Sequence, residues 1–365
     1  MPSLRNRRRP KVAFVLSGGG NLGPIQVGML RALTEREIVP DIVLGCSVGA
    51  LNGACYSSQP DMAGIRRLEA GWRAITAPDL MPSSRIPGAL QLIRRGESLH
   101  SNEALRRTVE SFLGERERFD QLELPYQCVA TEVDGAVERW FTEGSLVEPI
   151  LASAALPAVY PMVTIEGRRY LDGGVVNNVP VARAVELGAK RIYVLHVGLH
   201  GRPQAEVRRP IDAALQAYWI ARNSRLARDL AQLPRSVEAI VLPPGDRPEL
   251  RYDDFGQTPA LMAQGYAGAS EYLDRLAEAE AAEPGLADRV RREMFRSADW
   301  RRVLERRRQA AERERVASDG DFDVPTDDLA GDGSGGDGAD GSGARRGDRA
   351  GVTGGSSAGS GSSAP

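Results

Sequence analysis

The chain has 365 residues and a net charge of −2, and its 42% hydrophobic content is enough for a packed core. The charge balance gives no support to nucleic acid as a partner, and the longest apolar stretch, residues 150–163, is too short to span a bilayer. The apolar run at 12–16 behind the basic N-terminus is shorter than the about 7–15 residues of a signal peptide, so we expect a cytoplasmic or membrane-peripheral protein.

Short buried strands and helices alternate from the start of the chain. A continuous apolar run at 12–16 predicts a strand buried on both faces, and a second such run at 42–44 follows a helical pattern. Two strand–glycine turn–helix units in succession predict an α/β fold with three layers, α/β/α, around a mainly parallel sheet. Later strands are predicted at 126–133, 191–197 and 237–242, with helices at 181–187, 212–233 and 259–280.

Composition divides the chain into four parts. Residues 1–10 are predicted as a basic arm and residues 11–280 as one folded domain, with the glycine-marked motifs described below in 12–198. Residues 281–317 are predicted as a basic amphipathic helix, either resting on an anionic membrane or solvated through charge pairs four residues apart. Residues 318–365 hold 14 Gly and 9 Asp with almost no large apolar side chains, which predicts a disordered tail.

The first glycine turn, Gly-Gly-Gly-Asn-Leu-Gly at 18–23, matches the fingerprint of dinucleotide-binding folds. That fingerprint requires an acid at the end of the next strand, about 20 residues on, whereas Asp41 precedes that strand. The glycines can instead present backbone N–H groups to an anion, as an oxyanion hole does. The residues assigned to this hole are Gly18, Gly19, Gly20 and Gly23.

The second turn, Gly45-Cys46-Ser47-Val48-Gly49, matches G-x-S-x-G between a buried strand and a helix. Small neighbours there permit the strained turn that exposes a nucleophilic serine at a helix N-terminus. The same pattern at 355–359 lies in the predicted tail and has no such context. Ser47 is therefore the candidate nucleophile, and the alternative is a serine that only caps the helix.

A serine nucleophile needs a base, and the sequence offers two. His196 ends a predicted strand and would complete a triad in the order of α/β-hydrolases. Asp172, at the end of a short strand and followed by Gly173 and Gly174, would be the base of a dyad. The three cysteines, Cys46, Cys55 and Cys128, have no zinc-site spacing, and we expect no metal and no cofactor.

The three turns in this order resemble those of patatin-like phospholipases, serine acyl hydrolases that use a Ser–Asp dyad. The resemblance is carried by residues 44–53, 152–157 with Tyr160 and Pro161, and 170–180, and it covers about residues 11–198. It implies Ser47 as nucleophile, Asp172 as proton acceptor and the N–H groups of Gly19 and Gly20 as oxyanion donors. Gly45, Gly49, Gly173 and Gly174 would support the motifs.

The resemblance implies a lipid or phospholipid substrate, cleaved as by a phospholipase A or a lysophospholipase, with peripheral contact to an anionic membrane. One departure is Leu22, where members of the family commonly carry Arg or Lys. Residues 71–98, rich in Pro, Gly and Ser, could cover the cleft, although an ordinary surface loop fits them better. The alternative function is a non-catalytic module in which the glycine loop binds the phosphate of a nucleotide or a lipid.

Overall fold

The structure, a computed structural model, describes residues 11–76, 100–197, 228–245 and 254–282, with single positions from 213 to 226 and at 290. The contacts within the chain divide it into two units, Met1–Ala317 and Ser318–Pro365. Every described residue lies in the first unit. The predicted N-terminal arm and tail lie outside the described residues, as do 281–317 apart from 281, 282 and 290.

An eight-stranded, mainly parallel sheet forms the centre of the described part, as predicted. Its path is β5-β6-β3-β2-β1-β7-β8, with β4 also paired to β3. Strands β1, β2, β3, β7 and β8 run parallel, whereas β4, β5 and β6 pair antiparallel. The strands are β1 (Val12–Leu16), β2 (Ile42–Cys46), β3 (Tyr126–Glu132), β4 (Val137–Phe141), β5 (Val163–Ile165), β6 (Arg168–Asp172), β7 (Arg191–Leu195) and β8 (Glu238–Val241).

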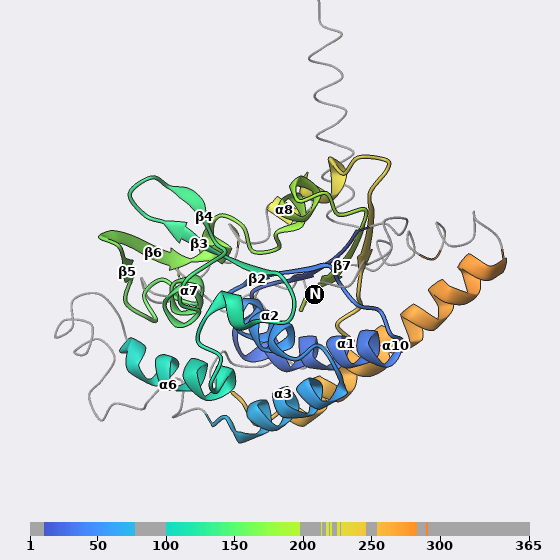
Figure 1. The fold of residues 1–365 in the computed structure, drawn as a ribbon, viewed down its shortest axis with the longest axis horizontal. Coiled ribbons are helices and arrows are strands. Elements are labelled where there is room, and N and C mark those ends of the chain that lie inside the picture. Colours follow the sequence, from blue (N-terminus) through green and yellow to red (C-terminus); the bar gives the residue numbers. More distant parts are fainter. Residues whose placement is uncertain are drawn as a thin grey trace, which may run out of the picture. The chain divides into compact units, whose positions relative to one another are not determined.

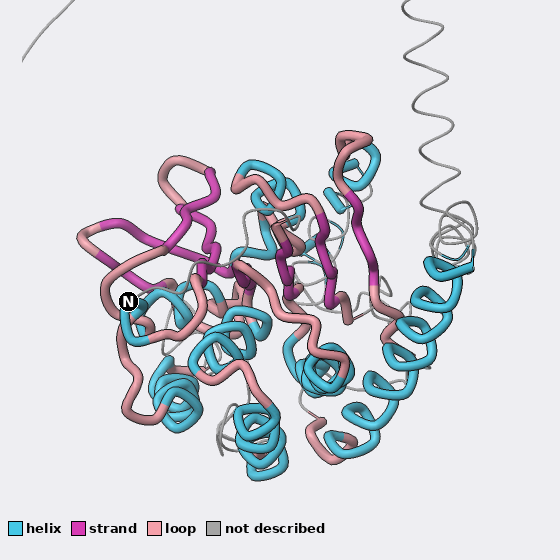
Figure 2. Tube along the Cα trace, turned by 45° about the vertical axis from the view of Figure 1, so that its right-hand side comes forward, coloured by secondary structure: helices cyan, strands magenta, loops and turns pink. Residues whose placement is uncertain are grey.

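Helices cover both faces of the sheet, which gives the predicted three layers (Figures 1 and 2). The larger set is α1 (Gly23–Glu35), α2 (Val48–Ser58), α3 (Met62–Ala74), α6 (Asn102–Leu113), α7 (Val147–Ser153) and α10 (Thr258–Ala282). Across the sheet lies α8 (Val181–Glu186). Three short 3-10 turns, η1 (Gly20–Leu22), η2 (Phe119–Gln121) and η3 (Gly173–Val175), join these elements.

Two hydrophobic clusters form the core, one on each face of the sheet. Alternate side chains of β1 point to opposite faces, so Phe14 and Leu16 join the larger cluster and Ala13 and Val15 the smaller one. The smaller cluster includes Leu226, whose backbone is helical, within the helix predicted at 212–233. Among the described helices, none is long and apolar enough to cross a membrane.

The structure differs from the sequence-based expectations in two parts of the chain. The stretch 71–98, considered as a cover, begins inside α3, which continues to Ala74, and residues 77–98 lie outside the described part. Strands β4 and β5 and helices α3, α6 and α7 were not predicted. Strand β4 is only partly buried and mixes charged with apolar residues, so it lacks the continuous apolar run of a central strand.

The pairing of β3 brings the second and third glycine turns together. Strand β4 pairs with residues 128–132 along one edge of β3. Strand β2 pairs with residues 126–129 of β3 and strand β6 with residues 130–132, so both must lie along the opposite edge. Along that edge Cys46 of β2 pairs with Val129, and Asp172 of β6 pairs with the next residue, Ala130. The end of β6 therefore meets the end of β2, where Ser47 follows.

Candidate active site

Ser47 sits on a strained turn between β2 and α2. Its backbone angles are φ 55° and ψ −124°, a conformation rarely adopted by residues other than glycine. The turn is tight: a Cβ at Gly45 would lie 2.4 Å from the carbonyl oxygen of Gly49, and one at Gly49 would lie 2.5 Å from that of Leu16. Glycine is thus required on both sides of the serine, as in a nucleophile elbow.

A second serine holds this turn in place. The N–H of Ser47 donates to Oγ of Ser153 at 2.8 Å, and the Ser153 hydroxyl donates to the carbonyl of Val129 at 2.6 Å. The hydroxyl of Ser47 makes no capping hydrogen bond to α2, and the residue keeps 9% of its surface exposed. The geometry therefore does not support the alternative in which Ser47 serves only as a helix cap.

Among the described residues, two of the four candidate N–H groups of the first glycine loop already have an acceptor. The N–H of Gly18 donates to the carbonyl of Asn178 at 3.2 Å, and that of Gly23 donates to the carbonyl of Gly20. The N–H groups of Gly19 and Gly20 have no acceptor within the described residues. An oxyanion site in this loop is thereby narrowed to Gly19 and Gly20.

A buried polar network fixes the same loop. Nε2 of Gln26 donates to the carbonyl of Ser17 at 2.7 Å, just before the glycines, and Nδ2 of Asn52 donates to the carbonyl of Gly23 at 3.1 Å. Asn52 also donates to Oε1 of Gln26 at 2.9 Å and accepts from Nε1 of Trp72 at 2.8 Å. Buried and hydrogen-bonded to each other, these side chains tie α1, α2 and α3 to the loop.

Asp172 is fully buried at the end of β6. Its Oδ1 accepts from the N–H of Gly174 at 2.7 Å and from the hydroxyl of Tyr218 at 3.1 Å. Its backbone is held as well, because its N–H donates to the carbonyl of Ala155 and its carbonyl accepts from the Thr131 hydroxyl at 2.8 Å. The carboxyl group therefore has a fixed orientation.

Asn178 marks the point where the three turns converge. A Cβ at Gly18 would lie 2.5 Å from Oδ1 of Asn178 and 3.1 Å from Cβ of Ser47. A Cβ at Gly174 would lie 3.1 Å from the same amide oxygen and 2.9 Å from Oδ1 of Asp172. The glycines leave the space in which the serine, the aspartate and this buried amide approach one another.

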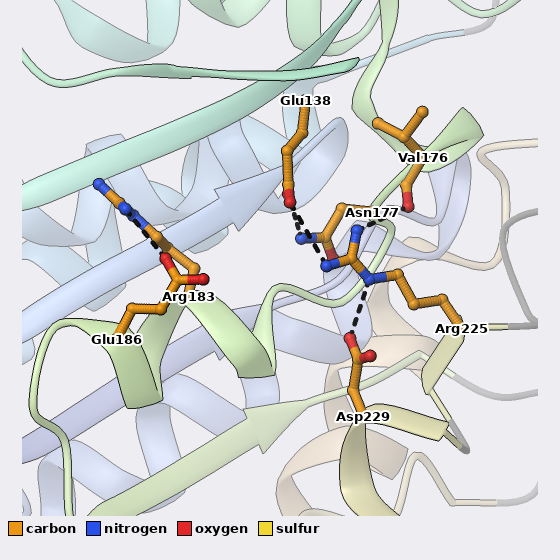
Figure 3. A network of polar contacts seen from close by, with 7 residues as sticks. All are labelled: Glu138, Val176, Asn177, Arg183, Glu186, Arg225 and Asp229. Carbon is orange, nitrogen blue, oxygen red and sulfur yellow. Dashed lines mark hydrogen bonds and ion pairs between the residues drawn. The ribbon is translucent and has the colours of Figure 1, made fainter. Parts of the chain in front are cut away.

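A network of charged groups holds Val176 and Asn177, in the loop that follows Asp172 in the chain (Figure 3). Arg225 donates to the carbonyl of Val176 at 3.2 Å and forms ion pairs with Asp229 at 3.1 Å and Glu138 at 3.4 Å. Glu138, on β4, also accepts from Nδ2 of Asn177 at 2.6 Å. Burial raises the pKa of Asp229, and the neighbouring Arg225 partly offsets that rise.

His196, the other candidate base, lies directly after β7. Strand β1 separates β7 from β2 in the sheet, so the ends of β7 and β2 are about 10 Å apart at the usual strand spacing. Asp41 lies at the amino end of β2, where it accepts from the N–H of Val12 at 2.8 Å. This placement agrees with the failure of the dinucleotide fingerprint. No group of metal-ligating side chains occurs among the described residues.

Three residues of the site were missed by the sequence analysis: Ser153, Asn178 and Tyr218. Ser153 is a polar residue inside the apolar stretch 150–163, a signal that could have marked it as a buried hydrogen-bonding group. Tyr218 lies in the predicted helix 212–233, where nothing in the local pattern points to Asp172. Leu22 is apolar, so it places no charge in the glycine loop, and it packs in the larger hydrophobic cluster.

Comparison with known proteins identifies related sequences. A model of the patatin-like phospholipase family matches residues 14–185. Patatin-like phospholipase domain-containing protein 7 of Rattus norvegicus is 31% identical over 211 residues, 57% of this chain and 15% of that protein. Lysophospholipase nte1 of Aspergillus terreus is 27% identical over 298 residues, 73% of this chain and 18% of that protein. The chain thus spans less than a fifth of either relative.

Two solved structures show weaker likeness. VipD from Legionella pneumophila is 14% identical with a TM-score of 0.35, covering 86% of this chain and 81% of VipD. Human GIVD cytosolic phospholipase A2, in complex with methyl gamma-linolenyl fluorophosphonate, is 13% identical with a TM-score of 0.38, covering 72% and 58%. At these scores neither likeness carries an argument. The family match and the sequence relatives lead to one conclusion: residues 14–185 of this chain are similar to the patatin-like phospholipase family.

Proposed function

We propose that this protein hydrolyses fatty-acyl esters of lipids through an acyl-enzyme on Ser47, with Asp172 as the base. The observation that carries the proposal is the pairing on β3, where Cys46 and Asp172 pair with two consecutive residues, Val129 and Ala130. Ser47 directly follows Cys46. The N–H groups of Gly19 and Gly20, with no acceptor among the described residues, lie on the adjoining turn. Nucleophile, base and oxyanion donors are the three groups that acyl transfer needs.

Acylation follows from these roles. Oγ of Ser47 attacks the acyl carbonyl carbon while Asp172 accepts the hydroxyl proton. The carbonyl oxygen becomes an oxyanion held by the N–H groups of Gly19 and Gly20, each worth about 3–4 kcal/mol in comparable enzymes. The tetrahedral intermediate then expels the alcohol, which takes the proton from Asp172. The products of this stage are the free alcohol and an ester on Ser47.

Deacylation repeats the chemistry with water. Asp172, ionised again, accepts a proton from a water molecule that attacks the ester carbonyl of the acyl-enzyme. The same two N–H groups stabilise the second oxyanion, and the proton returns to Oγ of Ser47 as the fatty acid leaves. The free enzyme is restored, and the cycle consumes one ester and one water.

The substrate class is proposed from the family. Patatin-like phospholipases are named for phospholipid hydrolysis, and the fungal relative is named as a lysophospholipase. We propose a (phospho)lipid substrate cleaved as by a phospholipase A or a lysophospholipase, in the cytoplasm or at an anionic membrane surface. Neither a metal nor an organic cofactor is needed for the steps described.

The proposal is tested by ester hydrolysis in three variants. With a lysophospholipid and a p-nitrophenyl acyl ester as substrates, Ser47→Ala and Asp172→Asn should each lower kcat/KM at least about 10³-fold. His196→Gln should retain activity within about threefold, since it leaves the dyad intact. Thermal unfolding shows whether each variant is folded. A loss in His196→Gln equal to that in Asp172→Asn would replace the dyad by a triad.

The alternative of a phosphate-binding module is decided by ligand binding. A thermal-shift screen with NAD, NADP, ATP and lysolipids compares the two functions directly. A shift of several degrees with a nucleotide, none with a lysolipid and no ester hydrolysis would establish the binding module instead. The engagement of the Gly18 N–H by Asn178 removes one of the phosphate donors that such a module would use.

A further inference from the structure

A tyrosine from a different part of the fold contacts the candidate base. Tyr218 is buried, with 8% of its surface exposed, and its hydroxyl donates a hydrogen bond to Oδ1 of Asp172 at 3.1 Å. The N–H of Gly174 donates to the same oxygen at 2.7 Å. Two donors thus fix one oxygen of the carboxylate, and hydrogen bonds to an ionised group are among the stronger ones in proteins.

The loop after Asp172 leaves room for this phenol. A Cβ at Gly174 would lie 2.6 Å from the hydroxyl oxygen of Tyr218 and 2.9 Å from Oδ1 of Asp172. Glycine at this position lets its backbone N–H and the phenol approach the carboxylate together. The Asp-Gly-Gly turn therefore leaves space for the Tyr218 hydroxyl beside the carboxylate of Asp172.

Arg225, seven residues after Tyr218, also contacts the loop of the aspartate. Tyr218 and Arg225 each have helical backbone. Arg225 holds the carbonyl of Val176 at 3.2 Å, four residues after Asp172 (Figure 3). The two side chains thus contact Asp172 and its loop at two points, the phenol on Asp172 and the guanidinium on Val176.

We propose that Tyr218 is a positioning residue for Asp172: its hydroxyl holds Oδ1 so that the carboxylate keeps the orientation needed to accept the proton of Ser47. This inference rests on the proposed dyad. Tyr218 contacts Oδ1 of the aspartate and acts through that carboxylate. Removing the phenol hydroxyl leaves Oδ1 with the N–H of Gly174 as its donor, which loosens the carboxylate and removes a donor that favours its ionised form.

The test is Tyr218→Phe, which keeps the ring and deletes only the donor. With a p-nitrophenyl acyl ester we expect kcat to fall about tenfold with KM unchanged, since the bond orders the base and not the substrate. The acid limb of the pH profile of kcat/KM should move upward by about one pH unit. The charged groups around the loop after Asp172, namely Glu138, Arg225 and Asp229, are the same in the wild type and in the variant.

Tyr266→Phe is the matched control. Its hydroxyl also donates to a carboxylate, Oε2 of Glu35 at 2.7 Å. Glu35 ends α1, whose length of 13 residues places it about 20 Å from Gly23 at the glycine loop. The control should retain the wild-type kcat and the wild-type acid limb.

The outcomes separate this inference from the proposed function. An inactive wild type would overturn the dyad and this inference with it. An active wild type with an unchanged Tyr218→Phe would overturn only the role of Tyr218. A lower kcat with the acid limb unmoved, in folded protein, would reduce the tyrosine to a packing role and also contradict the inference.

Discussion

The strained backbone of Ser47 depends on a hydroxyl from a segment 106 residues away. The N–H of Ser47 would be a buried donor without an acceptor if Ser153 did not supply one. We therefore expect Ser153→Ala to destabilise the protein by about 1–3 kcal/mol, the usual cost of a buried polar group left unpaired. Thermal unfolding measures the loss, and slower reaction of Ser47 with a fluorophosphonate would show that the turn has relaxed.

Ser57 provides the matched control for this substitution. Its side chain is also fully buried, but its Oγ has no hydrogen-bond partner in the described part of the chain. Ser57→Ala should leave stability unchanged or raise it, because it removes an unpaired polar atom. Equal destabilisation by the two substitutions would mean that the bridge to Ser47 contributes nothing.

At this scale the sequence predicts motifs but not the contacts between them. The serine turn, the Asp-Gly-Gly turn and the glycine loop are each encoded within a few residues. The local pattern was sufficient to propose Ser47, whereas Asp172 was proposed as the base through the resemblance to patatin-like phospholipases. The supports from Ser153, Asn178 and Tyr218 come from distant segments and use common residue types. Which of the four glycines of the first loop have available N–H groups also depends on a contact across the fold, that of Gly18 with Asn178.

At the scale of elements, two helices cross so closely that only glycine fits between them. In α1, a Cβ at Gly28 would lie 2.1 Å from the carbonyl oxygen of Met262 in α10. In α10, a Cβ at Gly265 would lie 2.2 Å from the carbonyl oxygen of Ile25 in α1. Both clashes are with backbone atoms, which cannot rotate away as a side chain can.

Gly265→Ala should therefore separate α1 from α10. We expect a loss of about 1–3 kcal/mol from overpacking, which exceeds the gain of up to about 1 kcal/mol in helix propensity. The melting temperature would fall by about 2–4 °C for each kcal/mol in a domain of this size.

Gly268→Ala, on the same helix, is the control. There the nearest heavy atom would be 3.2 Å away, so the change in stability should stay below about 1 kcal/mol. A Gly265→Ala variant as stable as the wild type would contradict the close crossing of α1 and α10.

The central elements were predictable because they bury continuous apolar runs. Strand β1 was predicted with the bounds observed, and β2, β3, β7, β8 and α10 with ends that differ by one or two residues. The outer elements were not predicted, since β4 and β5 are partly exposed and their order in the sheet follows from pairing with β3. That pairing is non-local: β6 joins β3 across about 40 residues and so sets the place of Asp172.

At the scale of the whole molecule, all three cysteines of the chain are buried in the core. Burial raises the pKa of the Cys55 and Cys128 thiols to about 12, and the thiolate is the form that reacts. The native protein should therefore release no thionitrobenzoate from a disulfide reagent at pH 8, whereas protein unfolded in guanidinium chloride should release three equivalents. Rapid reaction of one thiol in the native state would contradict the packing described here.

The two-sided packing of the sheet is also what assembles the site. Helices α1, α2 and α3 hold the glycine loop from one face through the Gln26–Asn52–Trp72 network. The segment with Tyr218 and Arg225 holds the loop of Asp172, and Leu226 beside it belongs to the cluster on the other face. The proposed nucleophile and the proposed base are thus supported by side chains from opposite faces of the sheet, and they meet at the end of β2.

The measurement that tests the dyad most directly is the intact mass after fluorophosphonate treatment, with peptide mapping, of the wild type beside Asp172→Asn. We predict a single adduct on Ser47 in the wild type and its loss or a slowing of at least about 100-fold in the variant. Equal labelling of the two folded proteins would show that Asp172 does not activate the serine. No adduct in folded wild type would contradict the acyl-enzyme on Ser47.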